Sequence, residues 1–112
     1  MQDVMTTEMI YELITGLLDI FRDNIQEIIL YGSVARNQET DESDIDIAVV
    51  LKHEFNTEVK KKFIEWSAEL DLKYEKIFSI VDIEKEYLDK WGEVLPFYKN
   101  IRQEGVVLWK AA

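Results

Sequence analysis

Two short aliphatic runs, each next to a polar stretch, constrain the fold of this chain most strongly. Residues 28–31 (IILY) lead directly into Gly32 and Ser33, while residues 44–51 (DIDIAVVL) begin as an alternation and then become continuously apolar. Runs of about 4 to 8 apolar residues bounded by turn-forming residues are typical of β-strands. A continuously apolar end indicates a strand that is buried on both faces. The sequence therefore predicts two strands within a covered sheet.

Helical spacing of apolar residues surrounds these strands. It extends over residues 6–21, where Thr6 or Thr7 can be the N-cap, and it resumes after Asn56, which can cap a second helix. The other predicted elements are a strand over residues 74–83, helices over residues 84–91 and from Pro96 to the Glu104-Gly105 pair, and a short final strand over residues 106–109. This order predicts one α/β domain over residues 1–112, with helices flanking a small mixed sheet.

The charge of the chain restricts its partners. Thirteen Lys and Arg against 23 Asp and Glu give a net charge of −10. Because nucleic-acid binders depend on cationic contacts to phosphates, a long polynucleotide is not expected as the main substrate. A metal-chelated nucleotide or a basic protein fits better, although the excess charge could also serve solubility alone. Without cysteine, a basic apolar leader or an apolar run of membrane-spanning length, we expect a cytoplasmic protein that is not bound to a membrane.

Asp44 and Asp46 are candidate metal ligands. Residues two apart on a strand project from the same face of the sheet. Magnesium prefers oxygen ligands, and two Mg²⁺ ions about 3.5–4 Å apart can hold both ends of a phosphoryl-transfer reaction. The buried aliphatic residues that follow would hold this strand rigid. An Asp-x-Asp pair by itself is more often only a solvated strand end.

Gly32, Ser33 and Arg36 are candidate phosphate ligands. A glycine allows close approach of the backbone, and the serine offers a hydroxyl beside free N–H groups. If a short helix begins after this turn, its N-terminus points toward the same anion, and Arg36 adds a planar cation. A Gly-Ser pair alone is usually just a turn. The tryptophans and tyrosines are more typical of core or interface positions than of base-stacking platforms.

Together these residues resemble a known family. The stretch GSVARNQETDESDIDIAVV (residues 32–50) has Gly-Ser, ten further residues and then Asp-x-Asp, with a strand on each side. It resembles the nucleotidyltransferase superfamily that includes DNA polymerase beta, and most of all the minimal nucleotidyltransferases (MNT type) of bacteria and archaea. Residues 94–109 resemble the ending of one branch of that family. The resemblance implies a polymerase beta-like fold, ATP as substrate and two Mg²⁺ ions as cofactors.

The resemblance also implies a role for each site residue. Gly32 and Ser33 would hold the triphosphate, Arg36 would contact phosphate, and Asp44 and Asp46 would ligate the metals. The family often has glycine after that arginine, where this chain has Asn37, a residue that tolerates left-handed backbone.

The resemblance further implies a third carboxylate, an aspartate in the family, on the neighbouring strand, and the best-fitting position in this chain holds Glu75. We expect Glu75 to act as a catalytic residue that ligates metal and helps to deprotonate the acceptor hydroxyl. The alternative, Asp82, lies seven residues further along the predicted strand. At about 3.3 Å per residue it would lie about 23 Å away, too far to serve the same site.

The family resemblance extends to a partner. Many such proteins are encoded beside a HEPN-domain protein, often a toxic ribonuclease, and attach AMP from ATP to one of its tyrosines. The resemblance therefore implies an antitoxin-like protein adenylyltransferase, and the acidic surface suits a basic partner. The alternative is a catalytically weak or inactive protein that silences a HEPN-type partner by occlusion. A small-molecule nucleotidyltransferase is disfavoured because no acceptor domain is evident. The sequence does not determine the acceptor, the base preference or the oligomeric state.

Overall fold

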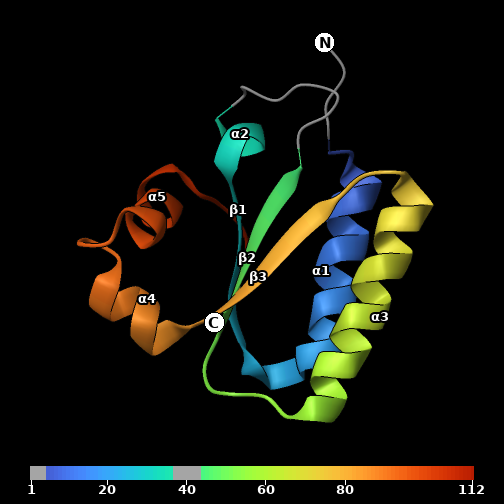
Figure 1. The fold of residues 1–112 in the computed structure, drawn as a ribbon, viewed down its shortest axis with the longest axis horizontal. Coiled ribbons are helices and arrows are strands. Elements are labelled where there is room, and N and C mark those ends of the chain that lie inside the picture. Colours follow the sequence, from blue (N-terminus) through green and yellow to red (C-terminus); the bar gives the residue numbers. More distant parts are fainter. Residues whose placement is uncertain (1–4, 37–43) are drawn as a thin grey trace.

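Residues 5–36 and 44–112 are described in a computed structural model, which contains a four-stranded mixed sheet (Figure 1). The strands occur in the order β3-β2-β1-β4, where β1 is antiparallel to β2 and β4, and β2 is parallel to β3. Their bounds are Ile25–Tyr31 for β1, Ile45–Leu51 for β2, Phe78–Glu84 for β3 and Val106–Lys110 for β4. The predicted fold class, a small mixed sheet with flanking helices, is therefore confirmed.

The helices occupy nearly the predicted positions. Thr6 and Asn56 are the N-caps of the two long helices, and the side chain of each accepts a hydrogen bond from the backbone three residues later. The helical elements are α1 (Thr7–Phe21), a 3-10 turn η1 (Arg22–Asn24), α2 (Gly32–Ala35), α3 (Thr57–Tyr74), α4 (Lys85–Trp91) and α5 (Pro96–Glu104). In the part of the chain that is described, no helix is both long and apolar enough to cross a membrane.

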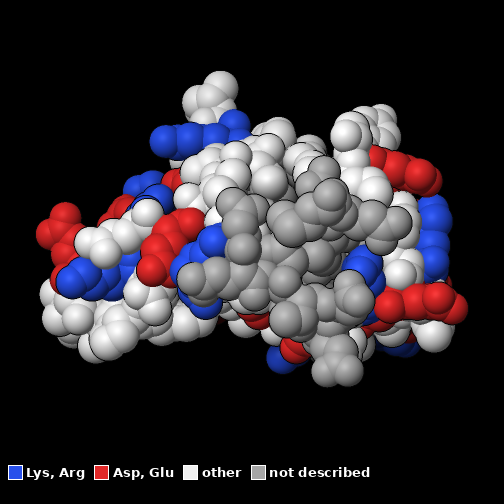
Figure 2. All heavy atoms as spheres, turned by 90° about the horizontal axis from the view of Figure 1, so that it is seen from above, with Lys and Arg blue, Asp and Glu red and all other residues white. Residues whose placement is uncertain are grey.

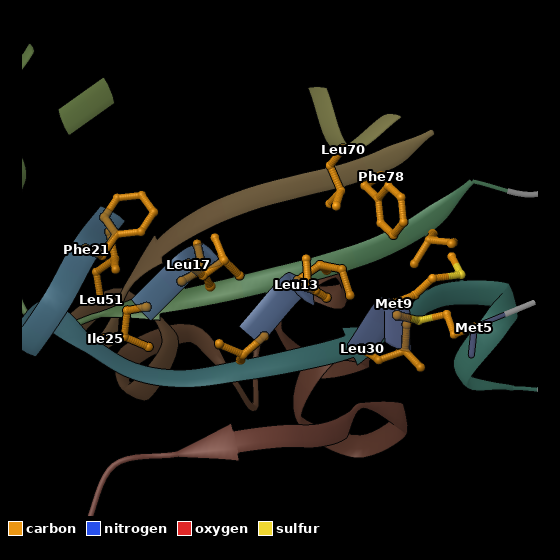
Figure 3. Close-up of a cluster of buried hydrophobic side chains, with 14 residues drawn as sticks. Met5, Met9, Leu13, Leu17, Phe21, Ile25, Leu30, Leu51, Leu70 and Phe78 are labelled. Atoms are coloured by element: carbon orange, nitrogen blue, oxygen red, sulfur yellow. The ribbon is translucent and has the colours of Figure 1, made fainter. Parts of the chain in front are cut away.

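The sheet separates two layers of helices (Figure 1). Successive side chains of a strand point to opposite faces, and the burial of β2 follows this rule. Ile47 and Val49 pack with α1 and α3 in the larger core, part of which is shown in Figure 3, whereas Ala48 and Val50 pack with α4 and α5 in a smaller one. The face of β2 that carries Asp46 is therefore the face covered by α4 and α5.

The start of β3 differs from the prediction. Helix α3 continues through Tyr74, and β3 begins only at Phe78. The helix end is fixed by Asp71, whose backbone carbonyl accepts from the Lys76 N–H at 3.2 Å and whose carboxylate accepts from the Phe78 N–H at 2.9 Å. Residues 74–77 therefore form the end of the helix and the turn after it.

Candidate functional site

The two aspartates lie at the start of β2 on one face of the sheet. Ile45 between them is fully buried in the larger core, so Asp44 and Asp46 face the α4–α5 side. Asp44 is exposed and Asp46 is half-buried. The pKa of Asp46 is raised, first by burial and then by the negative charge of Asp44, while Arg36 opposes the shift. This arrangement places two anions close together where a cation would relieve their repulsion.

Gly32 brings the turn that was predicted to bind phosphate against this acidic pair. Its φ of +76° lies in the region that glycine adopts without strain. A Cβ added at Gly32 would overlap with Oδ2 of Asp46, so any other residue would have to displace the carboxylate. Tyr31, the preceding residue, is the register partner of Asp46 across the antiparallel pair. The structure thus brings Gly32 and Asp46 into direct proximity, as the sequence predicted.

The sequence left open whether a short helix begins at Val34, and the structure contains one, α2, that begins two residues earlier, at Gly32. Ser33 is half-buried in its first turn. Arg36 ends the helix, and its guanidinium forms a 3.1 Å ion pair with Glu104 at the end of α5. This pair ties the turn to the α5 layer and holds the arginine near Asp46. Residues 37–43, including Asn37, lie outside the described residues.

Glu75 does not lie on the strand next to Asp46, so its predicted strand position is wrong. It is the exposed C-cap of α3, with φ 52° and ψ 41°, three residues before β3 begins. Within residues 5–36 and 44–112, no three His, Cys, Asp or Glu side chains are grouped closely enough to hold a metal ion. The structure therefore does not bring Glu75 to Asp44 and Asp46, and we do not retain it as a third ligand or as an acceptor-activating base.

Ser79 occupies the strand position that was predicted for the third carboxylate. The parallel register pairs Asp46 with Ser79, and the next residues of β3 on the same face, Val81 and Ile83, belong to the smaller core. Asp82 instead pairs with Val49 and shares the face of the larger core. Asp82 is therefore excluded from the site because its side chain faces the other layer of helices. The reason is not the distance of about 23 Å that follows from about 3.3 Å per residue along a strand. Ser79 was missed because the register could be counted only once the start of β3 was known.

Three aromatic rings lie next to the aspartate pair, that of Tyr31 at the end of β1 and those of Phe97 and Tyr98 on α5. Tyr31 is half-buried, and burial together with the charge of Asp46 raises its pKa. The Phe97 ring meets the Tyr31 ring edge to face, with centroids 5.9 Å apart, and meets the Tyr98 ring at 5.4 Å. Sequence reasoning did not single out Phe97, because the resemblance of residues 94–109 to a family ending assigns no role to its individual residues.

A cavity of about 590 Å³ lies elsewhere, between the end of α1 and β4. Its lining includes Asp19, Arg22, Lys52 and Trp109, and it contains none of the predicted site residues. Its walls carry charges of both signs. The chemical groups at the ends of β1 and β2, rather than this cavity, define the candidate site.

Residues 10–108 match the nucleotidyltransferase domain family. The chain belongs to this family. MJ0604 of Methanocaldococcus jannaschii, provisionally named a protein adenylyltransferase, is 34% identical over 103 residues, which cover 89% of this chain and 94% of the relative. MJ0141 of the same organism, with the same provisional name, is 31% identical over 78 residues, which cover 70% and 79%.

Solved structures share the fold at low sequence identity. One is the MntA–HepT toxin–antitoxin, with a TM-score of 0.56, 18% identity and coverage of 95% of this chain and 74% of the other. A second contains the tri-AMPylated HEPN toxin of Shewanella oneidensis with its MNT antitoxin, with a TM-score of 0.57, 18% identity and coverage of 96% and 74%. A third, a toxin–antitoxin structure with AMP-PNP, has a TM-score of 0.52, 20% identity and coverage of 87% and 73%.

Proposed function

We propose that this protein is an adenylyltransferase that transfers AMP from ATP to a tyrosine hydroxyl of a separate HEPN-domain protein. The observation that carries the proposal is the contact between the Gly32 backbone and the Asp46 carboxylate, with Asp44 on the same face. The names of the archaeal relatives support AMP transfer to a protein, and the AMPylated toxin in a structure of the same fold supports a HEPN-domain acceptor.

The residues present suit magnesium. Asp44 and Asp46 offer carboxylate oxygens from one strand face, and the pKa of Asp46 is raised first by burial and then by the negative charge of Asp44. Two Mg²⁺ ions held there with the triphosphate would supply charge neutralisation and a template for in-line displacement. The two carboxylates meet only part of the coordination of such ions, so phosphate oxygens and water would complete it.

The chain's own residues position the donor. The Gly32-Ser33 turn offers a close-approaching backbone and a hydroxyl to the phosphates, and Arg36 supplies a cation on the same side, fixed by Glu104. In the reaction, the acceptor oxygen forms a bond to the α-phosphorus while the bond to the bridging α–β oxygen breaks. Pyrophosphate leaves and the hydroxyl proton is released. Most of the required catalysis is positioning and charge neutralisation.

The acidic character of the chain supports a basic protein partner. Its net charge is −10, and complementary charge accelerates encounter and selects partners. Figure 2 looks onto the end of the sheet where β1 ends and β2 begins, and it shows acidic groups beside basic ones at both sides of this face. A HEPN-domain protein that binds RNA would present the opposite charge.

The direct test is label transfer. Incubation of the protein with α-labelled ATP, Mg²⁺ and a HEPN-domain partner should label a tyrosine of the partner. Asp44→Ala combined with Asp46→Ala should abolish labelling. The double variant should also lose the thermal stabilisation by MgATP, which is worth about 2.7 kcal/mol at 100 times Kd. Asp82→Asn is the matched control, because this exposed aspartate lies on the same sheet but faces the other layer. Equal labelling by the double variant and the control would refute the site.

A second function, silencing of the partner by occlusion alone, is favoured by one observation. The position beside Asp46 on β3 holds Ser79 rather than a carboxylate. A site with one charge fewer binds metal more weakly and lacks that carboxylate as a proton acceptor. If the partner is bound and inhibited while no label is incorporated and no ATP is consumed, occlusion replaces transfer as the function.

A further inference from the structure

Phe97 presents an exposed aromatic ring whose orientation is fixed. Two edge contacts hold it, one to Tyr31 with an interplanar angle of 86° and one to Tyr98 at 72°. Nevertheless, 45% of the residue is accessible to water. Burial of apolar surface is favourable in proportion to its area, so a ring that is packed on two neighbours but left open on another side forgoes part of that stabilisation. Such a ring is well suited to a ligand that covers it.

The position of this ring relates it to the donor site. Tyr31 is the cross-strand partner of Asp46 and directly precedes Gly32. Cross-strand partners have Cβ atoms about 4.5–5.5 Å apart, and the Phe97 ring lies one ring beyond Tyr31. A nucleotide with its phosphates at Gly32 and Asp46 and its nucleoside directed toward α5 would bring its base to this ring.

We propose that Phe97 stacks on the purine base of the nucleoside triphosphate and so anchors the nucleoside half of the donor. This inference rests on the proposed adenylyltransferase function and adds the residue that holds the base. Stacking on an aromatic ring contributes about 5- to 150-fold in affinity, and it tolerates different bases because each has a π-face. ATP and GTP are therefore both stabilised by the ring, and base selection is weak at this contact.

A nearby feature offers another occupant for the same ring. Val94 and Leu95 are exposed immediately before α5, at 64% and 41%. An apolar segment of the acceptor protein could cover these residues together with Phe97. We favour the base over a protein segment because the Phe97 ring contacts Tyr31, the cross-strand partner of Asp46. No described contact links Val94 to Asp44 or Asp46.

Calorimetric titration separates these possibilities. MgATP and magnesium triphosphate, the latter lacking any nucleoside, are titrated into the wild type, Phe97→Leu and Phe97→Trp. Leucine keeps apolar bulk against Tyr31 but removes the π-face, and tryptophan retains it. Tyr11→Ala is the matched control, since Tyr11 is a 71% exposed aromatic residue on α1, in the opposite layer. We expect Phe97→Leu to weaken MgATP binding at least about 5-fold while triphosphate affinity stays within twofold, and Phe97→Trp to bind MgATP like the wild type.

Three other results of these titrations and of the labelling assay would contradict the stacking role of Phe97. Equal loss of affinity for MgATP and triphosphate would show that Phe97 only supports the turn through Tyr31. Unchanged MgATP affinity with lost partner labelling would assign the ring to the acceptor protein instead. Both results overturn the stacking role and leave the adenylyltransferase function intact. If the wild type binds neither ligand, the donor site itself is refuted, and the role of Phe97 with it.

Discussion

The face of the sheet under α1 and α3 and the face under α4 and α5 are built from the same strands but differ in what they bury. On the first face, the inward residues of β2 are apolar and fully buried against side chains such as Leu13 and Leu17. On the second, polar groups stand at both ends of the strands, with Glu27 at one end and Asp46 at the other. The comparison teaches that the alternation of strand residues can place only apolar groups on one face and leave room for polar groups on the other.

The largest effect is expected on the first face. Leu17→Ala removes a fully buried side chain of α1 and should lower the free energy of unfolding by about 2–5 kcal/mol. Denaturant titration measures this loss. At a temperature where the variant remains folded, its affinity for MgATP should match that of the wild type. A parallel loss of MgATP affinity would show that the two faces are coupled rather than separate.

A partly buried ion pair tests the second face. Glu27 is 5% exposed, and its carboxylate accepts from Nη1 of Arg102 at 3.2 Å, while Nη2 of Arg102 reaches Asp89 at 3.3 Å. Arg102→Met leaves the Glu27 charge buried without its partner, and we expect a loss of about 2–3 kcal/mol in the free energy of unfolding. Adding Glu27→Gln to that variant should recover at least half of the loss. If the double variant is less stable than Arg102→Met, Glu27 stabilises the fold through other contacts.

The first face was also the more predictable one. Helical spacing and caps, such as Thr6 for α1 and Asn56 for α3, depend on neighbours within a few residues, so the sequence alone indicates them. On the second face, the close approach of Gly32 to Asp46 was predicted as well, because both residues belong to one short motif whose spacing is visible in the sequence. The close packing of Trp66 on Gly16, where a Cβ would lie 2.5 Å from the indole, depends on how α1 and α3 cross and has no sequence signal.

The prediction of the third carboxylate at Glu75 was wrong because it depended on a distant part of the chain. Its identity depends on the register between β2 and β3, which is fixed by where α3 ends. Residues 74–77 contain aromatic and β-branched residues that are typical of strands, but Asp71 binds the Phe78 N–H and delays the strand. A shift of a few residues in that start replaced Glu75 by Ser79 beside Asp46.

Ser79→Asp sharpens the comparison by adding a charge to the second face. An aspartate there would join Asp46 on the same face of the neighbouring strand, and cation affinity rises with the number of charged ligands. We expect about tenfold tighter binding of Mg²⁺ or Mn²⁺ in the absence of nucleotide, measured by calorimetry. Ser79→Ala is the control that changes the side chain without adding charge. Metal affinity unchanged by Ser79→Asp would mean that position 79 does not reach the ions held by Asp46.

The smallest effect is expected from removing a charge at the same place. Burial and the charge of Asp44 raise the pKa of Asp46, so the folded state holds its proton more tightly than the unfolded chain does. Stability of the wild type therefore falls as the pH rises from the ordinary Asp value, about 3.9, through the higher folded value. In metal-free protein at pH 7, Asp46→Asn should raise the free energy of unfolding by about 0.2–1 kcal/mol, the range found for interactions between solvent-exposed charges.

The pH dependence distinguishes this relief from a change in packing. The advantage of Asp46→Asn should vanish below about pH 3.9, where the wild-type carboxyl is protonated in both states. It should also shrink when Asp44→Asn is introduced first, because one source of repulsion is then already absent. A loss of several kcal/mol in Asp46→Asn at every pH would identify Asp46 as a structural residue, and the second face would then contribute to stability in the same way as the first.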